Sequence, residues 1–375
     1  MYNGVLTLQL PTGVKIVGFA DDITLVVVGE SLEAVEILAT EAVDAVENWM
    51  QRKKLSIAHQ KTELVLISNC KVVQKAAIIV GEHAIDSKRE LKHLGVMIDD
   101  RLNFNSHVDY ACGKAAKAIT ALSRIMPNNS AISSSKRRLL ASVSTSILRY
   151  ASPAWATATK TRRNRVQVCS THRLMAMRVA SAYRTISSDA VCVIAGMVPI
   201  VFVLEEDKEC YEARGARGAR KAARVVTMAK WQHEWNTTAK GRWTHRLIPN
   251  LVEWVNRDHG EVNFHLTQFL SGHGCFKKYL HRFGHAGSPF CPECGDVEES
   301  PEHVVFECPR FTVERSEMTA ICGAGIRADN IVTRMCRDEA CWNAVNAAVV
   351  KIMSFLQRKW REQQMNDRRD NPGQA

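Results

Sequence analysis

The chain has 375 residues, of which 46% are hydrophobic and 24% are charged. This composition is typical of globular proteins and excludes wholesale disorder, and the length predicts two or three domains of ~150 residues each. The longest apolar runs fall far short of the ~20 residues that span a bilayer, and the N-terminus carries no visible secretory signal. The 12 cysteines are too few and too irregularly placed for a disulfide scaffold, so we expect an intracellular protein with reduced thiols and no membrane contact.

The net charge of +11 is concentrated in the middle of the chain. Residues 103–246 carry 24 Lys and Arg against 8 Asp and Glu, whereas residues 1–102 carry 11 against 14 and residues 247–375 carry 15 against 17. Because Lys and Arg on phosphates release condensed counterions, the basic middle segment indicates nucleic-acid contact. A set of solvated helix faces is the alternative explanation.

The first third of the chain is expected to be α+β. β-branched runs at residues 14–19 and 23–28 predict a hairpin around Ala20-Asp21-Asp22. Ser31 is placed to cap a helix whose apolar positions recur every three or four residues up to Trp49. Further strands are expected at residues 61–68, 76–80 and 94–98, with a turn at residues 81–82 and a short return strand.

From residue 103 the apolar spacing becomes helical. Helices are expected at residues 107–126, 136–151, 162–178 and 191–206, with a break at residues 127–130 and an interruption near Gly196 and Pro199. Residues 212–224 are rich in Arg, Gly and Ala, which predicts a mobile connector. Four tryptophans follow at positions 231, 235, 243 and 254. Aromatic rings among cations can stack bases, but core packing is the more frequent role of Trp at this spacing.

Phe19-Ala20-Asp21-Asp22 is the first chemical signal. Adjacent Asp residues in a turn usually cap or solvate it, but the flanking runs here are almost wholly apolar. We therefore expect a hairpin that is buried in a sheet and presents carboxylates at its tip. Such oxygen ligands suit Mg²⁺, and two ions ~4 Å apart can activate a 3′-hydroxyl and stabilise a pyrophosphate leaving group. That chemistry needs a further acid from elsewhere in the fold.

The second signal is a set of four potential metal ligands, Cys291, Cys294, His303 and Cys308. Three thiolates and one imidazole satisfy tetrahedral Zn²⁺, and Cys-x₂-Cys is the usual close pair. Gly295 suits the tight knuckle that follows the pair. Four ligands close the site, which predicts a structural metal. A redox Cys-x-x-Cys pair or three buried thiols are the alternatives.

Other His and Cys residues are weaker candidates. His273, His281 and His285 are expected to be surface or core histidines, because their spacing does not supply a second zinc site. Three cysteines lie in helical patterns and are expected to be small core residues; these are Cys322, Cys336 and Cys341. The Gly215-to-Gly218 stretch follows no predicted strand and is not a phosphate loop.

Taken in order, these motifs resemble the reverse transcriptases of non-LTR, LINE-like retrotransposons, and in particular the Pol polyproteins of type-1 elements. Residues 19–22 resemble the aromatic-Ala-Asp-Asp box of the polymerase palm. Residues 59–63 resemble the next palm motif, whose lysine lies near the incoming nucleotide. Residues 93–96, followed by Asp99, Leu102 and His107, resemble the primer grip. The Cys-Cys-His-Cys set, with residues 271–282 before it, resembles a motif that follows the thumb and handles nucleic acid.

The resemblance implies an RNA-directed DNA polymerase as the activity of a full-length polyprotein. It implies Asp21, Asp22 and Lys61 as catalytic residues, with Asp21 and Asp22 as the Mg²⁺ ligands, and Zn²⁺ on the four Cys and His ligands. The partners would be an RNA template, a DNA primer or target, and dNTPs, which places the protein in the nucleus.

Several family parts are not recognisable in this sequence. In the family, the fingers, a strand with the first catalytic Asp and an endonuclease lie upstream of the Asp-Asp box, but only 18 residues precede Phe19 here. We therefore expect a C-terminal fragment that does not polymerise alone. A non-catalytic nucleic-acid-binding remnant of such an element is the alternative. An unrelated zinc-stabilised adaptor is a third, and the basic middle segment counts against it.

The expected fold class is α+β: a partial polymerase palm of antiparallel sheet plus helix, a helical thumb, and a mostly α-helical C-terminal domain with a zinc knuckle. The expected segments are the palm remainder (1–102), the basic thumb (103–210), a basic connector with the Trp-rich segment (211–260), the zinc-binding region (261–315) and C-terminal helices (316–375).

Overall fold

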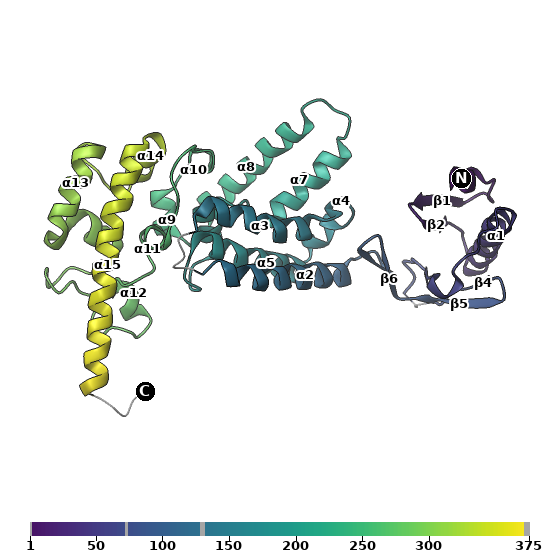
Figure 1. Cartoon of the computed structure of the whole chain (residues 1–375), viewed down its shortest axis with the longest axis horizontal. Helices are drawn as coiled ribbons and strands as arrows, with labels where there is room; N and C mark the ends of the chain where they lie inside the picture. The colour runs from purple at the N-terminus through teal and green to yellow at the C-terminus, as the bar shows by residue number, and fades with distance from the viewer. Residues whose placement is uncertain (1, 72–73, 128–131, 371–375) are drawn as a thin grey trace. The chain divides into compact units, whose positions relative to one another are not determined.

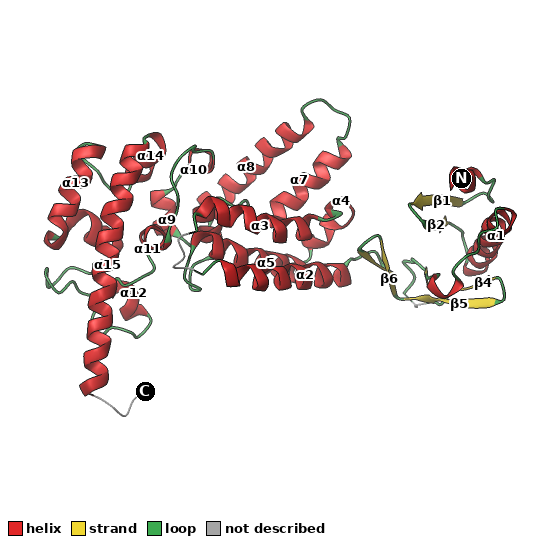
Figure 2. Cartoon of the chain, in the orientation of Figure 1, coloured by secondary structure: helices red, strands yellow, loops and turns green. Residues whose placement is uncertain are grey.

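The computed structural model describes residues 2–71, 74–127 and 132–370. The chain divides into two compact units, Met1–Tyr110 and Ala111–Ala375. The fold is mixed α+β and mostly helical, and all the named strands of the described residues belong to the first unit (Figures 1 and 2). The break expected at residues 128–130 lies outside the described residues.

The first unit consists of one long helix and three small sheets. Its elements are η1 (Tyr2–Thr7), β1 (Val14–Phe19), β2 (Asp22–Val27), α1 (Leu32–Arg52), η2 (His59–Lys61), β3 (Leu64–Val65), β4 (Ala77–Val80), β5 (His83–Lys88), β6 (Glu90–His93) and β7 (Val96–Asp99). β1 pairs with β2, β5 lies between β3 and β4, and β6 pairs with β7.

The expected hairpin is confirmed, and its tip is a two-residue turn. β1 and β2 are antiparallel, and Phe19 lies opposite Asp22, so Ala20 and Asp21 form the turn. Ala20 has a positive φ of 51°, which is the left-handed conformation that tight hairpin loops require. Asp21 in the turn and Asp22 at the start of β2 therefore both lie at the tip of the hairpin.

The expectation that the hairpin is buried in a sheet is wrong, because β1 and β2 form a separate two-stranded sheet. On one face, Ile16 and Ile23 pack against Trp49 of α1. On the other face Val17 is 53% and Phe19 is 63% exposed. On this second face the described contact is between Thr24, which lies opposite Val17, and His93, and it leaves Val17 and Phe19 exposed.

Helix α1 forms as its sequence predicts. Ser31 is the N-cap, and its hydroxyl accepts a hydrogen bond from the Ala34 backbone N–H at 3.1 Å, which satisfies one of the free donors of the first turn. The buried positions recur every three or four residues, as an amphipathic helix requires; they are Ala39, Ala42, Val43, Val46 and Trp49.

Two of the expected strands differ in the structure. The strand expected at residues 61–68 is confined to Leu64–Val65, because the 3₁₀ turn η2 occupies the residues before it. The strand expected at residues 94–98 begins only at Val96, because Leu94 and Gly95, both with positive φ, form the tight turn between β6 and β7. Two consecutive positive φ values are typical of two-residue hairpin loops. The strand and return at β4 and β5 are confirmed.

The second unit is mostly helical in its described part, with one isolated β-bridge between Phe290 and Glu298. Its elements are α2 (Asn105–Ile125, which begins in the first unit), α3 (Ser134–Arg149), α4 (Ser152–Trp155), η3 (Ala156–Lys160), α5 (Arg162–Ala180), α6 (Ser188–Ala195), α7 (Ile200–Glu212), α8 (Ala219–Thr237), α9 (Arg242–Leu247), α10 (Leu251–Val255), α11 (Phe264–Ser271), α12 (Lys277–Arg282), η4 (His303–Glu307), η5 (Pro309–Phe311), α13 (Thr312–Cys322), α14 (Ile331–Arg337) and α15 (Glu339–Asp370). No single described helix has the length and apolar content of a membrane span; α6 and α7 reach them only as a pair bent by 65°.

The helix boundaries correct one expectation and confirm another. Gly196, with a φ of 62°, ends α6, and α7 begins after Pro199, so the expected interruption is confirmed. The expected connector at residues 212–224 is wrong in extent, because α8 already begins at Ala219 and only residues 213–218 lie between helices. The sequence of α8 is rich in Ala and carries an apolar face, and both features favour a helix over a coil.

The tryptophans pack in the core of the second unit. Trp231, Trp235 and Trp254 are each at most 2% exposed. Two of the indole N–H groups have carbonyl partners: Trp235 Nε1 donates to the Ile248 carbonyl at 2.8 Å and Trp254 Nε1 to the Val193 carbonyl at 2.7 Å. Buried Trp contributes a large apolar area when its N–H has a partner, so these rings hold α6, α8 and α10 together and are not available for base stacking.

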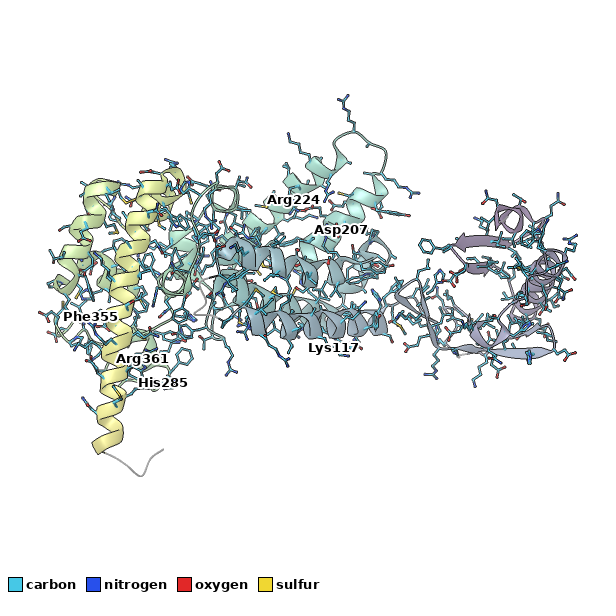
Figure 3. The ribbon with its side chains drawn as sticks, in the orientation of Figure 1. Lys117, Asp207, Arg224, His285, Phe355 and Arg361 are labelled. Atoms are coloured by element: carbon cyan, nitrogen blue, oxygen red, sulfur yellow. A yellow bond between two sulfur atoms is a disulfide. The ribbon has the colours of Figure 1, made fainter. Side chains whose placement is uncertain are left out.

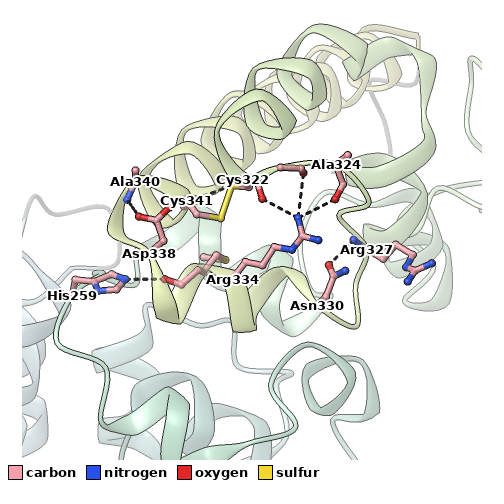
Figure 4. The surroundings of a disulfide bond; sticks show 11 residues. His259, Cys322, Ala324, Arg327, Asn330, Arg334, Asp338, Ala340 and Cys341 are labelled. Atoms are coloured by element: carbon pink, nitrogen blue, oxygen red, sulfur yellow. Dashed lines mark hydrogen bonds between the residues drawn. A yellow bond between two sulfur atoms is a disulfide. The ribbon is translucent and has the colours of Figure 1, made fainter.

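One pair of cysteines is oxidised, contrary to the expectation of reduced thiols. Cys322 at the end of α13 and Cys341 in the first turn of α15 form a disulfide with a Cα–Cα distance of 4.8 Å (Figure 4). The other ten cysteines are free. The pair is 19 residues apart in sequence, so only the packing of the two helices brings it together. Arg334 donates to the Cys322 carbonyl at 2.8 Å beside the bond.

Candidate functional site

The four candidate metal ligands converge in the second unit. One ligand atom from each of Cys291, Cys294, His303 and Cys308 lies within 4.8 Å of the others. Zn–S bonds of ~2.3 Å at tetrahedral angles place two sulfurs ~3.8 Å apart, and the Sγ atoms of Cys291 and Cys308 are 3.8 Å apart. The geometry therefore matches the thiolate spacing of a tetrahedral zinc site.

The local backbone explains the convergence. Cys291 and Cys294 lie on a knuckle in which the Gly295 N–H donates to the Cys291 carbonyl at 3.0 Å. Gly295 has a φ of 71°, a conformation that side chains disfavour. The single turn η4 supplies His303, and the Cys308 N–H donates back to the His303 carbonyl at 2.7 Å. Two short turns thus bring together ligands that are distributed over 18 residues of sequence.

His303 has the environment of a metal ligand. Its side chain is buried, and its Nδ1 lies 3.4 Å from a carboxylate oxygen of Glu307. Its Nε2 is buried and has no hydrogen-bond partner among the described residues. A buried unpaired nitrogen is costly, whereas a metal-bound imidazole characteristically holds its second nitrogen against a carboxylate. The residues present therefore fit Zn²⁺, with Nε2 as the coordinating atom.

Arg310 and Glu299 surround the cluster and were not singled out from the sequence. Arg310 donates from Nε to Cys308 Sγ at 3.3 Å and from a terminal nitrogen to Cys291 Sγ at 3.2 Å. It also pairs with the buried Glu299 carboxylate at 2.5 Å. Burial raises the pKa of the Cys308 thiol, but the hydrogen bonds from Arg310 outweigh burial and hold that pKa below its usual value. A cation two residues after the last ligand is the sequence signal that could have identified it.

Glu299 also connects the cluster to helix α12. Its second oxygen accepts a hydrogen bond from the Lys277 backbone N–H at 3.2 Å, and its carbonyl accepts one from the Lys278 N–H at 3.3 Å. Both donors belong to the first turn of α12. A carboxylate is favourable there, because helix N-termini leave free N–H groups.

The remaining histidines near the cluster do not join it. His273 stacks on Tyr279, with 4.7 Å between ring centroids, and its Nδ1 lies 3.0 Å from the Thr185 hydroxyl. Burial lowers the pKa of His273 to about 4. His281 and His285 are exposed. Cys336, expected to be a small core residue, is half-buried, and burial raises the pKa of its thiol to about 11.

The Asp-Asp tip is open to solvent. Asp21 and Asp22 are exposed, and Lys61 is exposed at the end of η2. Within the described residues, no third potential metal ligand joins the two carboxylates, since the one group of three or more is the Cys-His cluster. The structure therefore places the Asp pair where a ligand could reach it, without completing a metal site.

The hairpin with the primer-grip resemblance contacts the Asp-Asp hairpin. Thr24 Oγ1 in β2 lies 3.4 Å from His93 Nε2 at the end of β6. Asp99 accepts hydrogen bonds from the N–H groups of Asn103 at 3.1 Å and Phe104 at 2.6 Å, and His107 Nδ1 accepts one from the Met97 N–H at 3.3 Å. Asp99 and His107 thus stabilise the loop that leads into α2.

Part of the basic excess in residues 103–246 is structural. Arg137 is 2% exposed and donates to the Arg178 carbonyl at 2.9 Å and the Ser181 hydroxyl at 2.6 Å. Arg149 pairs with Asp207 at 2.6 Å. Other cations of this segment are exposed, among them Lys117, which Figure 3 labels on α2. Some of these cations therefore have structural partners inside the unit, which neither nucleic-acid contact nor the alternative of solvated helix faces anticipated.

Comparison with known proteins identifies relatives by sequence. The chain is 25% identical over 341 residues to the retrovirus-related Pol polyprotein from type-1 retrotransposable element R1 2 of Nasonia vitripennis, and the match covers 82% of this chain and 81% of that protein. It is also 25% identical over 330 residues to the R1 polyprotein of Bradysia coprophila, where the match covers 82% of this chain and 33% of the relative. A shorter match to the R1 polyprotein of Popillia japonica has 35% identity over 111 residues, which is 29% of this chain and 43% of the relative. No family model and no solved structure matches the chain. The chain is thus homologous to the Pol polyproteins of type-1 retrotransposable elements R1.

Proposed function

We propose that this chain is the part of a retrotransposon RNA-directed DNA polymerase that holds template and primer, with a structural zinc in its C-terminal region. The observation that carries the proposal is the convergence of the four Cys and His ligand atoms within 4.8 Å, in a chain homologous to Pol polyproteins. The RNA template and the DNA target are the substrates, and copying RNA at chromosomal DNA places the protein in the nucleus.

The proposed zinc has a structural role, because protein side chains fill all four of its coordination positions and leave none for a substrate or water. The segment around it contains few large apolar residues, among them the buried Val304, Val305 and Phe311. Ordering the backbone costs ~1–2 kcal/mol per residue, which this inventory does not offset over some thirty residues. A bound Zn²⁺ crosslinks the knuckle and η4, and binding free energy in such segments is folding free energy.

The proposed nucleic-acid contact draws support from the start of α5. Arg162 and Arg165 lie in its first turn, both are exposed, and the turn contains no acidic residue. Neither guanidinium has a carboxylate partner among the described ion pairs. Cations at a helix N-terminus oppose the helix dipole, and this cost is offset when phosphates bind there. The exposed cations of this unit would contact the sugar-phosphate backbone without base preference.

For polymerisation we propose Asp21 and Asp22 as Mg²⁺ ligands and Lys61 as a contact of the incoming nucleotide. Bound Mg²⁺ would supply activation of the 3′-hydroxyl and charge neutralisation at the leaving group. The turn at Ala20 and Asp21 positions the carboxylates, and the contact between Thr24 and His93 fixes the hairpin against β6. A further acidic ligand has to come from another segment of the polyprotein, so this chain alone would not extend a primer.

A non-catalytic nucleic-acid-binding protein is the second candidate. It is favoured by one observation: among the described residues, the exposed Asp pair has no third metal ligand. The zinc and nucleic-acid predictions are the same for both candidates. Primer extension by a polyprotein that includes this chain separates them, because only the polymerase depends on Asp21.

A fluorescence-anisotropy titration with a labelled RNA–DNA hybrid duplex tests the nucleic-acid contact. The affinity of the full chain should fall by one to several decades between ~50 and ~200 mM salt. The variant R162Q/R165Q should reduce the log–log salt slope by ~2, since each phosphate contact contributes ~0.9. The control R246Q/R337Q removes two cations that are paired with carboxylates and should leave the slope unchanged. A flat salt response of the wild type would overturn the proposal.

A further inference from the structure

The helical hairpin of α7 and α8 carries a tip whose role is not explained by the core or the zinc cluster. The two helices pack along each other, and the tip, residues 213–218, projects beyond the neighbouring helices of the second unit (Figure 1). Four cations lie at or next to it; they are Arg214, Arg217, Arg220 and Lys221, and all four are exposed. Between residues 213 and 224, the remaining positions are Gly, Ala and one further Arg.

The stem below the tip is electrostatically balanced. Arg224 of α8 pairs with Glu206 of α7 at 3.2 Å, and Lys230 lies 3.1 Å from Glu209 and 3.3 Å from Glu205. The other two acidic residues of α7 are paired as well; Asp207 binds Arg149 and Glu212 binds Lys208. Figure 3 labels Arg224 and Asp207 on the two helices of this stem. Every carboxylate of α7 is therefore paired away from the tip cations, and the one acidic residue of α8, Glu234, lies 16 residues beyond Gly218 in the chain.

The tip cations lack carboxylate partners among the described residues. The Arg214 guanidinium lies 4.8 Å from the ring centroid of Tyr211 and donates a hydrogen bond of 3.4 Å to its hydroxyl. Arg220 and Lys221 lie in the first turn of α8, which contains no acidic residue, so they also oppose the helix dipole. Repulsion between these like charges and the dipole of α8 both disfavour such a cluster of cations, unless an anion binds to it.

The tip is ordered by its own backbone. The Ala216 N–H donates to the Ala213 carbonyl at 3.1 Å, and the Ala219 N–H donates to the Ala216 carbonyl at 3.2 Å. Gly215 and Gly218 have φ values of 93° and 83°, and nothing lies within 4 Å of the position that a Cβ would take at either. Two successive turns thus present arginines at intervals of three residues, with open space beside the backbone.

We propose that this tip binds single-stranded nucleic acid. The three arginines and Lys221 contact successive phosphates, and Tyr211, which is 53% exposed, stacks against one base with Arg214 on its ring. The tip has no aliphatic side chain larger than that of Ala, so it lacks the apolar face that membrane-surface segments insert. The inference deepens the proposed function, since it assigns a single-strand contact to a site distinct from the start of α5.

The test is an anisotropy titration of the full chain with labelled 20-nucleotide oligo(U) and oligo(dT) at several salt concentrations. The variant R214Q/R217Q/R220Q should reduce the log–log salt slope by ~2, because each phosphate contact on a single strand contributes ~0.7. Tyr211→Ala should weaken binding roughly 5- to 150-fold with an unchanged slope, and Tyr211→Phe should retain the affinity. The matched control R246Q/R337Q/K351Q removes three exposed cations that are already paired and should leave the slope unchanged.

The outcomes separate this inference from the proposed function. If the wild type binds the RNA–DNA duplex but the triple Arg variant keeps the wild-type slope on both oligonucleotides, the tip assignment is overturned and the proposed function stands. If the wild type binds neither duplex nor single strand, both are overturned. Loss of binding to vesicles of anionic phospholipid in the triple variant, with oligonucleotide binding unchanged, would also overturn the assignment. Circular dichroism of each variant checks that α7 and α8 remain folded.

Discussion

The Cys-His cluster and the Asp-Asp tip are both short sequence signals with metal-binding side chains, but their structures differ. The cluster draws its ligands from a short segment, and the atoms meet within 4.8 Å. The tip presents Asp21 and Asp22 to solvent without a third ligand among the described residues. A structural metal site is closed by local turns, whereas a two-metal catalytic site is assembled from distant segments and from the substrate itself.

The Cys-His cluster and the Asp-Asp tip also differ in the size of the hydrophobic core that surrounds them. Cys291 and Cys308 belong to the large core of the second unit, together with the tryptophans of α8 and α10. The hairpin rests on two small clusters of three and four buried residues, which are Val5, Val46 and Trp49, and Ala39, Val43, Ile78 and Val80. Loss of a zinc ligand should therefore affect stability, and loss of a tip carboxylate should affect activity alone.

The largest expected effect is on polymerisation. In the full-length polyprotein, Asp21→Ala should reduce primer extension with Mg²⁺ and dNTPs by roughly 10³-fold or more, because a lost metal ligand removes several kcal/mol of transition-state stabilisation. Zinc content and thermal unfolding should not change. Glu30→Ala, which removes another exposed carboxylate of the first unit, is the control. Retained activity in Asp21→Ala would remove this residue from the catalytic role.

Removal of a zinc ligand should loosen the second unit locally. In Cys308→Ser the zinc content should fall from one per chain to near zero, and proteases should cleave within residues ~285–315 while the first unit stays intact. Acid should have a similar effect, since binding requires thiolates and a neutral imidazole, and affinity should fall below pH ~6. Elemental analysis and limited proteolysis measure these changes, with Cys70→Ser, an exposed free cysteine, as the control. Clearly less than one zinc in the folded wild type would contradict the assignment.

Arg310 offers a finer test of the same cluster. Arg310→Gln removes hydrogen bonds to two ligand sulfurs and to Glu299. Partners outside the coordination shell typically contribute 10- to 100-fold to metal affinity, so zinc should be lost to a chromophoric chelator at a correspondingly lower chelator concentration. Arg327→Gln, which changes an exposed arginine of the same unit, should behave as wild type. Equal zinc affinity in both variants would mean that Arg310 has no part in holding the metal.

The smallest expected effect concerns the support of the Asp-Asp hairpin. Ser31→Ala removes the N-cap of α1 and should lower the free energy of unfolding of the first unit by ~1 kcal/mol. Hydrogen exchange should report faster exchange in α1, β1 and β2, with protection in α5 and α8 unchanged. Ser31→Asn keeps a capping acceptor and should restore protection. A change of equal size in the second unit would show that the two units do not unfold separately.

Sequence reasoning succeeded where structure is local. The cap at Ser31, the period of α1, the turn before Asp22 and the four spaced metal ligands all depend on residues close together in the chain. It failed where distant residues decide the outcome. The exposed outer face of the hairpin and the disulfide between Cys322 and Cys341 depend on which elements pack together.

The sequence by itself determined the first hairpin, the helix after it, the basic middle segment and the potential ligand set at Cys291, Cys294, His303 and Cys308, because capping, hydrophobic period and ligand spacing act over a few residues. Only the tertiary structure decided which cations are free. Arg137 and Arg149 are held by internal partners, whereas Arg217 and Arg220 at the α7–α8 tip are exposed without one. Charge counts do not distinguish these cases, since pairing depends on where the neighbouring helices place their carboxylates and carbonyl groups.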